Sequence, residues 1–332
     1  MASSDATTNP EEGVDTMLAA EPNQPSSPCI VAGFDNSPSG YDAVALARRL
    51  AAAIDARLIV AYIYTEVLSA IDIVPPPELV AQRRDEALGT VERASIALDG
   101  FDRWEPVAYA SEPAARGLHE LADRAGAELI VVGSTHRHGL GRVVPGATGE
   151  RLLHGSACPI AIAPAGWRGD AIETIGAGFD GLPESRAALS AAATLAYASG
   201  ASLRALSAFE APNPANPVYA VTGHGYTEIM GELREMRRAQ LDQAVAGLPC
   251  RVDADGRIID GEPAEVLVAE SERLDLLVLG SRGYGALRAT LAGSVTHALA
   301  GASRCPLVLV PRGVARPLAG LASRGGRRTA AR

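Results

Sequence analysis

Short apolar runs alternate with longer segments in which apolar residues recur every three or four positions. A continuous apolar run of about four to eight residues is typical of a buried strand, and the longer spacing is typical of an amphipathic helix. The first half of the chain therefore predicts strands at 30–34, 57–64, 106–110, 128–132 and 159–163. It predicts helices at 42–54, 78–98, 113–125 and 146–155.

The same order of elements recurs in the second half. It predicts strands at 174–179, 202–209, 276–279 and 306–310, with helices at 184–198 and 228–246 and a further helical segment ending near 304. Three pairs of positions are each separated by 147 residues (280 − 133, 293 − 146 and 305 − 158): Gly133 with Gly280, Gly146 with Gly293, and Cys158 with Cys305. A constant separation over this span indicates an internal duplication.

Alternating strands and helices predict a parallel sheet covered by helices on both faces, and right-handed crossovers then favour a doubly wound order. We predict two tandem α/β domains, each with a doubly wound five-stranded parallel sheet, at 29–165 and 172–312. The strands at 159–163 and 306–310 should pack together as an intramolecular pseudo-dimer, because this pairing hides two apolar edges. We expect disordered tails at 1–28, which is rich in Pro, Ser, Asn and acids, and at 313–332, which is basic.

A glycine-rich stretch follows the fourth strand of the second repeat. In doubly wound sheets the ligand binds beyond the carboxyl ends of the strands. At this edge the chain carries the pattern G-x2-G-x9-G-S, at Gly280, Gly283, Gly293 and Ser294. Glycine lets the backbone approach a ligand closely, and a Gly-Ser pair at a helix start offers N–H groups to an anion. The stretch therefore predicts a phosphate site, with Asp180, at the end of the first strand, on the same crevice.

Other roles stay open for the same residues. The glycines could serve only turns and helix packing, and Ser294 and Asp180 could only cap helices. Arg282 is either a phosphate contact or an ordinary surface charge.

Composition excludes several classes of function. The chain has no lysine, which removes the P-loop, and its net charge of −9 argues against general nucleic-acid binding. The six histidines form no ligand-spaced cluster, so we predict no metal site, and no G-x-S-x-G or H-E-x-x-H pattern marks a catalytic residue. No apolar run reaches the ~18 residues of a membrane span. The acidic N-terminus lacks a signal peptide's basic start, so we expect a cytoplasmic protein that contacts no membrane.

The pattern G-x2-G-x9-G-[ST], flanked by a buried strand and a Cys-Pro strand, resembles that of the universal stress protein family in a tandem form. The resemblance covers about residues 29–164 and 172–311. It implies an adenine-nucleotide-binding domain that takes ATP, with or without Mg, or AMP or cyclic AMP. It places Asp180 near the adenine or ribose and Ala208 near the base. It also places Gly280, Gly283, Gly293, Ser294 and the Val295 amide at the ribose and phosphates.

The first repeat departs from this pattern. It keeps Asp35, Gly133 and Gly146, but the second glycine position is His136, and Gly146 is followed by Ala147 with Thr148 one place later. Ala147 has no hydroxyl for a phosphate, although its N–H can still bind one. The loop at 135–142 could compensate through Arg or His contacts. We therefore count Asp35, Gly133, Gly146, Ala147 and Thr148 as candidates, and leave open whether both repeats bind.

The resulting hypothesis is a stress-response protein that binds ATP in the second-repeat crevice. Binding would bias the loops at 282–292 and 211–227 toward one conformation and so regulate unknown protein clients, in a pseudo-dimer or a homo-oligomer. The alternatives are a nucleotide-free interaction scaffold and a slow ATPase.

Overall fold

The computed structural model describes residues 28–65, 76–135, 141–152, 156, 158–169, 171–211, 226–249, 251–281, 294–313 and 318. The strands are β1 Cys29–Gly33, β2 Arg57–Tyr64, β3 Trp104–Ala110, β4 Leu129–Gly133, β5 Ile160–Ala163, β6 Thr174–Gly178, β7 Ser202–Phe209, β8 Ala254–Asp260, β9 Leu276–Gly280 and β10 Leu307–Val310. The helices are α2 Pro38–Ile54, α3 Pro77–Glu92, the 3-10 helix η1 Arg93–Ala97, α4 Ala114–Ala125, α5 Ala147–Leu152, α6 Pro183–Ser199, α8 Tyr226–Ala246, α9 Pro263–Ser271 and α10 Ser294–Ala302.

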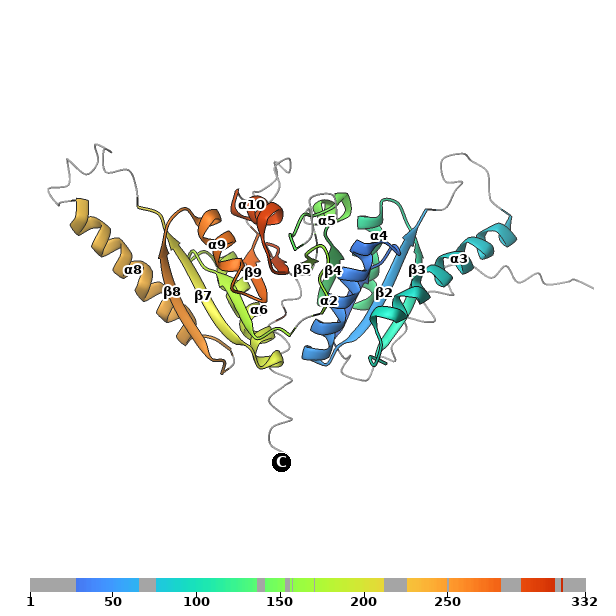
Figure 1. Cartoon of the computed structure of the whole chain (residues 1–332), viewed down its shortest axis with the longest axis horizontal. Coiled ribbons are helices and arrows are strands. Elements are labelled where there is room, and N and C mark those ends of the chain that lie inside the picture. Colours follow the sequence, from blue (N-terminus) through green and yellow to red (C-terminus); the bar gives the residue numbers. More distant parts are fainter. Residues whose placement is uncertain are drawn as a thin grey trace, which may run out of the picture.

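All ten strands belong to one sheet, in the order β3-β2-β1-β4-β5-β10-β9-β6-β7-β8. Within each half every pairing is parallel, whereas β5 and β10 pair antiparallel where the halves meet. The predicted doubly wound topology and the predicted pairing of 159–163 with 306–310 are thereby confirmed. The two five-stranded sheets are one continuous sheet, which places β3 and β8 at its two ends (Figure 1).

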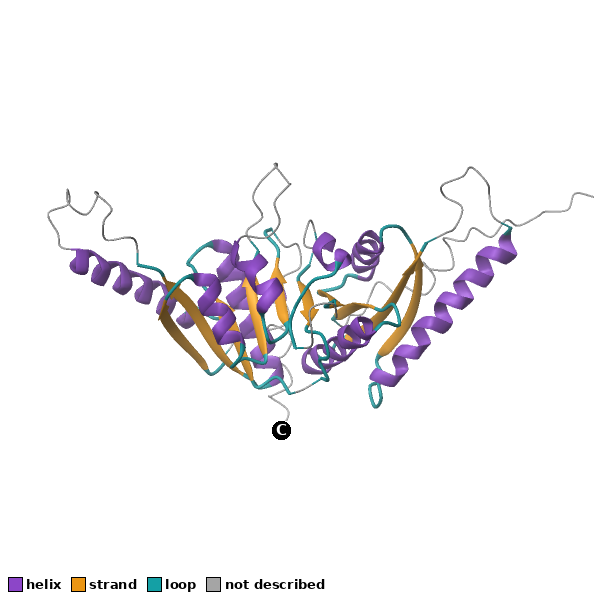
Figure 2. Ribbon diagram, turned by 45° about the horizontal axis from the view of Figure 1, so that its top comes forward, coloured by secondary structure: helices purple, strands orange, loops and turns teal. Residues whose placement is uncertain are grey.

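Each face of this sheet has one apolar core that includes side chains from both repeats. Helices α2, α3, α6 and α8 cover one face, and α4, α5, α9 and α10 cover the other (Figure 2). The central contact is Val308 of β10 opposite Ala161 of β5, and both side chains are fully buried. Because the cores continue across this junction, the two repeats are buried against each other.

The start of α2 shows how local sequence positions an element. Ser37 caps the helix by accepting a hydrogen bond on Oγ from the Gly40 N–H at 3.2 Å, and Pro38 occupies the first turn, where its missing N–H leaves no bond unmade. The helix therefore begins at Pro38, four residues before the predicted start. This difference brings the capping segment to the carboxyl end of β1, where the predicted ligand would sit.

The strand β8 was not predicted. Its sequence, ADGRIID, has few apolar residues, and its side chains are partly or well exposed because it lies at one end of the sheet. Parallel pairing with β7, which joins Leu206 to Arg257 and Ala208 to Ile259, defines it instead. An edge strand with one solvated side leaves a weak hydrophobic signal.

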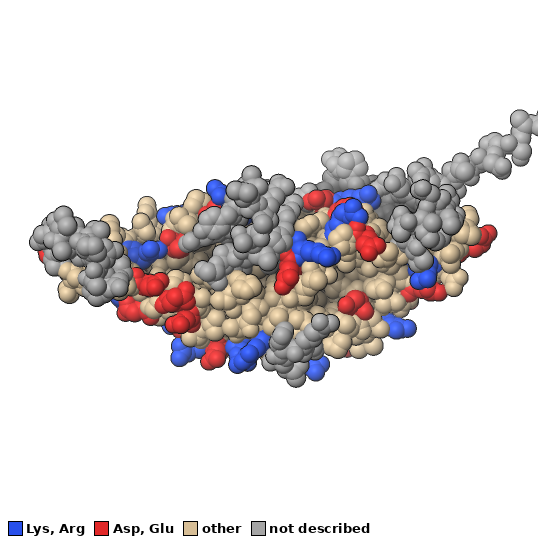
Figure 3. Space-filling model, turned by 90° about the horizontal axis from the view of Figure 1, so that it is seen from above, with Lys and Arg blue, Asp and Glu red and all other residues tan. Residues whose placement is uncertain are grey.

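Within the basic segment predicted as a disordered tail, the structure describes only Gly313 and Leu318. Leu318 is fully buried and belongs to the core on the α2 and α6 face. Among the described residues, no helix is long and apolar enough to cross a membrane. Figure 3 shows acidic and basic side chains interspersed on one face rather than a field of a single sign.

Candidate functional site

A cavity of about 720 Å³ opens at the carboxyl ends of the strands of the first repeat. Its lining comes from the ends of β1, β2 and β4 and from the starts of α2, α4 and α5. Strand β1 lies between β2 and β4, and the helices that follow β1 and β4 pack on opposite faces of the sheet. The cavity therefore lies at the topological switch point, where doubly wound sheets bind their ligands.

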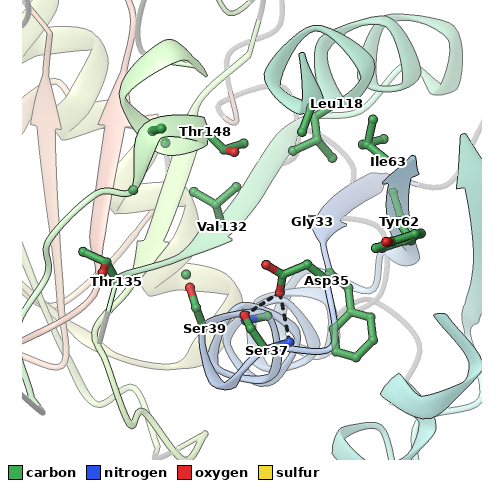
Figure 4. A pocket seen from close by; sticks show the side chains of 18 of the residues that line it. Gly33, Asp35, Ser37, Ser39, Tyr62, Ile63, Leu118, Val132, Thr135 and Thr148 are labelled. Carbon is green, nitrogen blue, oxygen red and sulfur yellow. Dashed lines mark hydrogen bonds between the residues drawn. The ribbon is translucent and has the colours of Figure 1, made fainter. Parts of the chain in front are cut away.

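All five site residues predicted in the first repeat line this one cavity: Asp35, Gly133, Gly146, Ala147 and Thr148. They come from three chain segments: the residues after β1, the end of β4 and the start of α5. Figure 4 shows Asp35 and Ser39, from the β1–α2 side, across the cavity from Thr148 of α5. The convergence expected from the sequence is thus present in the fold.

Hydrogen bonds fix Asp35 at the end of β1. Its Oδ1 accepts hydrogen bonds from the Ser37 N–H at 3.1 Å and from the Ser37 hydroxyl at 2.5 Å (Figure 4). The same hydroxyl caps α2 through Gly40. Both bonds use Oδ1, and the side chain of Asp35 is exposed, so Oδ2 can accept a hydrogen bond from a ligand hydroxyl or amine.

Gly133 ends β4 directly against the first turn of α2. A Cβ at this position would lie 2.7 Å from the carbonyl carbon of Ser39 and closer still to its oxygen. Only glycine allows α2 to approach β4 this closely. Helix packing is therefore one role of Gly133, in addition to lining the cavity.

Gly146 differs from Gly133 in its surroundings. A Cβ added there would meet no atom within 4 Å, and no positive φ demands glycine. Among the described residues, no neighbour gives a packing reason for glycine at this position, although the residue lines the cavity next to Ala147 and Thr148. Free space over a cavity-lining glycine is what close approach of a ligand requires.

The chemistry of the described lining is mostly neutral. Asp35 and Tyr62 are its only titratable side chains, and hydroxyls come from Ser37, Ser39, Thr135 and Thr148. No arginine lies among the described lining residues; Arg142 is exposed outside it, and residues 136–140 lie outside the described part of the chain. An acidic acceptor, an aromatic ring and several hydroxyls suit a nucleoside better than they suit an isolated phosphate.

Sequence reasoning did not select four polar residues of this lining: Ser37, Ser39, Tyr62 and Thr135. The run Asn36-Ser37-Pro38-Ser39 indicated only a turn and a cap. Its position directly after a strand-ending aspartate was the available signal for a second role.

The second repeat places its candidates at the equivalent edge. Asp180 follows β6 and accepts a hydrogen bond on Oδ1 from the Leu182 N–H at 3.0 Å, Ala208 lies half-buried on β7, and Gly280 ends β9. A Cβ at Gly280 would lie 2.5 Å from the carbonyl carbon of Glu184 in α6, which repeats the close packing at Gly133. Val295 is half-buried in the first turn of α10.

The rest of the second-repeat motif is not placed. Ser294 is the first residue of α10, and nothing is described of its side chain. Arg282, Gly283 and Gly293 lie outside the described residues, as do nearly all of the loops at 282–292 and 211–227. The predictions made for these residues remain predictions. In the described part of the chain, no group of three His, Cys, Asp or Glu residues is arranged to hold a metal.

The fold and the strand-end cavity define a duplicated, doubly wound α/β protein with a ligand crevice at its switch point. The universal stress protein family model matches residues 29–164 and 171–311, and the chain belongs to this family. A universal stress protein of Mycolicibacterium smegmatis is 28% identical over 292 residues, covering 85% of this chain and 96% of that protein.

Two further comparisons differ in how much of this chain they cover. A universal stress protein of Thermus aquaticus is 31% identical over 144 residues, covering 42% of this chain and 98% of that protein. The crystal structure of a universal stress protein from Archaeoglobus fulgidus is 14% identical, covers 86% of this chain and 98% of that one, and superposes with a TM-score of 0.59. At this identity the likeness supports the fold.

Proposed function

We propose that this protein binds an adenine nucleotide, ATP in the first instance, in its strand-end crevices and acts as a nucleotide-responsive regulatory module. The observation that carries the proposal is the convergence of all five first-repeat candidates on one cavity of about 720 Å³. This volume lies within the range of roughly 300–1,000 Å³ that is usual for small-molecule sites.

The lining supports an assignment of the nucleoside end. Asp35, with Oδ2 available, would accept hydrogen bonds from ribose hydroxyls or the adenine amine, and Tyr62 and Ile63 would contact the base. Gly146 would let the backbone approach the phosphates, with the Thr148 hydroxyl as a donor. In the second repeat the complete G-x2-G-x9-G-S motif supports the same function, with Asp180 and Ala208 at the corresponding edge.

Calorimetric titration of the full chain with ATP, AMP and cyclic AMP tests the proposal. The Cβ that Gly146→Val adds would meet no described atom within 4 Å, so the substitution should fill the space over the glycine and leave folding intact. It should weaken binding at this site by at least about tenfold, or 1.4 kcal/mol. Gly89→Val is the matched control, because a Cβ at Gly89 on α3 also meets nothing within 4 Å and Gly89 does not line the cavity.

To separate the two repeats, Gly293→Val combined with Ser294→Ala would disable only the second motif. Nucleotide binding that survives both this pair and Gly146→Val together would refute the assignment of both sites. A protein that binds none of the three nucleotides would favour the nucleotide-free scaffold.

A further inference from the structure

A second cavity, of about 430 Å³, lies along the side of α2, away from the strand-end crevice. The crevice is lined by the first turn of α2, whereas this cavity is lined by residues 41–52 of the same helix. The end of η1 forms one wall, and residues 167–169, which follow β5, form another. Nothing in the proposed nucleotide function uses it.

Three arginines, Arg48, Arg49 and Arg168, line the cavity. None of them makes an ion pair or a side-chain hydrogen bond with any described residue. Eight other described arginines pair with carboxylates, whereas Arg83 and Arg84 on α3 pair with no described carboxylate, so the three are set apart by lining one cavity together. In a chain of net charge −9, three unpaired guanidinium groups around one cavity are a local positive site.

One acid also lines the cavity, and it is already engaged. Asp42 is only 5% exposed, and its Oδ2 accepts a hydrogen bond from the Gly166 N–H at 2.7 Å. This bond holds the segment after β5 against α2 and so places Arg168 beside the helix. The carboxylate serves the backbone of that segment, and the three guanidinium groups retain a net positive charge for a ligand.

The cavity also has an apolar side. Ile96 is 77% exposed, and it lines this cavity together with the half-buried indole of Trp167 and the small side chains of Ala45 and Ala52. An exposed isoleucine beside a tryptophan provides contact area for an apolar ligand group. A smaller cavity of about 210 Å³ shares Arg49 and Ala52 with this one and continues between α2 and α6 among apolar side chains.

We propose that this cavity binds a small amphipathic organic anion, a carboxylate with an apolar chain. The carboxylate would lie among the three arginines, whose planar groups donate paired hydrogen bonds to it. The chain would run along Trp167 and Ile96 toward the space between α2 and α6. An inorganic anion would leave the apolar wall unused, and an uncharged chain would leave the guanidinium groups unpaired.

Tryptophan fluorescence gives a direct assay. The chain has two tryptophans, so Trp104→Phe leaves Trp167 as the sole indole in the full-length protein. We would titrate this protein with sodium decanoate below its micelle concentration, with 1-decanol and with inorganic phosphate. A saturable change with decanoate, at a dissociation constant at least about tenfold lower than for decanol or phosphate, is expected.

Arginine variants locate the site. Arg49→Gln combined with Arg168→Gln should weaken decanoate binding by about tenfold or more, because each removed guanidinium costs at least one charge-assisted hydrogen bond. Arg83→Gln, on the exposed side of α3 and outside the cavity lining, is the matched control and should bind as the parent does.

Two results would overturn the proposal. One is the absence of a saturable response to decanoate. Binding of decanol as tightly as decanoate would count equally against it, because such binding would not depend on the arginines. The other is an arginine variant that keeps the parent's thermal melting and binds decanoate with unchanged affinity.

Discussion

Substituting Gly133 by alanine tests the close packing of α2 on β4. An added Cβ would lie 2.7 Å from the carbonyl carbon of Ser39, whereas real Cβ contacts essentially never fall below 3.0 Å, and the oxygen is nearer still. The obstacle is helix backbone, which cannot rotate away as a side chain can. The first turn of α2 must therefore shift or the end of β4 must bend.

The expected cost follows from this overlap. Overpacking a close-packed interior costs typically about 1–3 kcal/mol, and a backbone clash belongs at the upper end of that range. A loss of about 3 kcal/mol corresponds to a fall in melting temperature of roughly 6–12 °C for a cooperative unit of about 150–250 residues, and to a smaller fall when the two repeats, which share their cores, unfold together. Because Asp35, Ser37 and Ser39 move with the start of α2, a ligand in the crevice should also bind more weakly.

Thermal melting followed by circular dichroism, with urea titration for the free energy of unfolding, measures the effect. Gly146→Ala is the matched control in the same cavity, because its Cβ meets no atom within 4 Å. Gly280→Ala should reproduce the loss in the second repeat, since its Cβ would lie 2.5 Å from the carbonyl carbon of Glu184. If Gly133→Ala and Gly146→Ala melt within about a degree of each other, the packing argument is wrong.

Three further changes test other parts of the structure. Leu309→Ala, at the fully buried junction of the repeats, should lower the free energy of unfolding in urea by about 2–5 kcal/mol. The control Met236→Ala, at an exposed position, should change it by less than about 0.5 kcal/mol. Equal effects of the two substitutions would contradict the shared core. Burial raises the pKa of the Cys29 and Cys305 thiols to about 12. The folded state therefore keeps protons that the unfolded state releases above pH 9. The free energy of unfolding should fall between pH 9 and 12 by up to about 1.4 kcal/mol per pH unit for each thiol. Replacing both cysteines by alanine should flatten this alkaline slope in melting experiments, and an unchanged slope would assign it to other groups. Burial lowers the pKa of His119, opposed by a hydrogen bond with the Leu152 backbone, and its Nε2 has no hydrogen-bond partner among the described residues. Stability should therefore fall as pH drops below 6.5, where the unfolded state takes up more protons than the folded state. A His119→Gln variant that keeps the same acid slope would refute this.

Prediction of the fold succeeded where one local rule decided the outcome. The apolar runs at β1, β4, β5 and β9 are fully buried, and continuous apolar sequence is required of strands covered on both faces. Boundaries were less accurate. The start of α2 was placed four residues late, because the cap at Ser37 is set by a side-chain hydrogen bond rather than by periodicity. Strand β8 was missed because pairing with β7, not hydrophobicity, defines it.

The candidate site, like the fold, could be predicted from the sequence only in part. Asp35, Gly133, Gly146, Ala147 and Thr148 could be selected from the sequence, because parallel strands bring their carboxyl ends to one edge. Tyr62 and Thr135 could not be selected, since only the positions of β2 and the end of β4 relative to α2 turn them toward the cavity. The different roles of Gly133 and Gly146 were also invisible, because they depend on which backbone lies within 4 Å.

The sequence by itself determined the duplication, the alternation of strands and helices, the absence of a P-loop lysine and the family. Each of these is a property of residue type and spacing along the chain. The tertiary structure alone decided that the two sheets are one, through the antiparallel pairing of β5 with β10, and that each core spans both repeats. It also gathered Arg48 and Arg49 with Arg168 around one cavity, because the bond from Gly166 to Asp42 holds the segment after β5 against α2. Contacts between residues more than a hundred positions apart follow from packing, which no local pattern encodes.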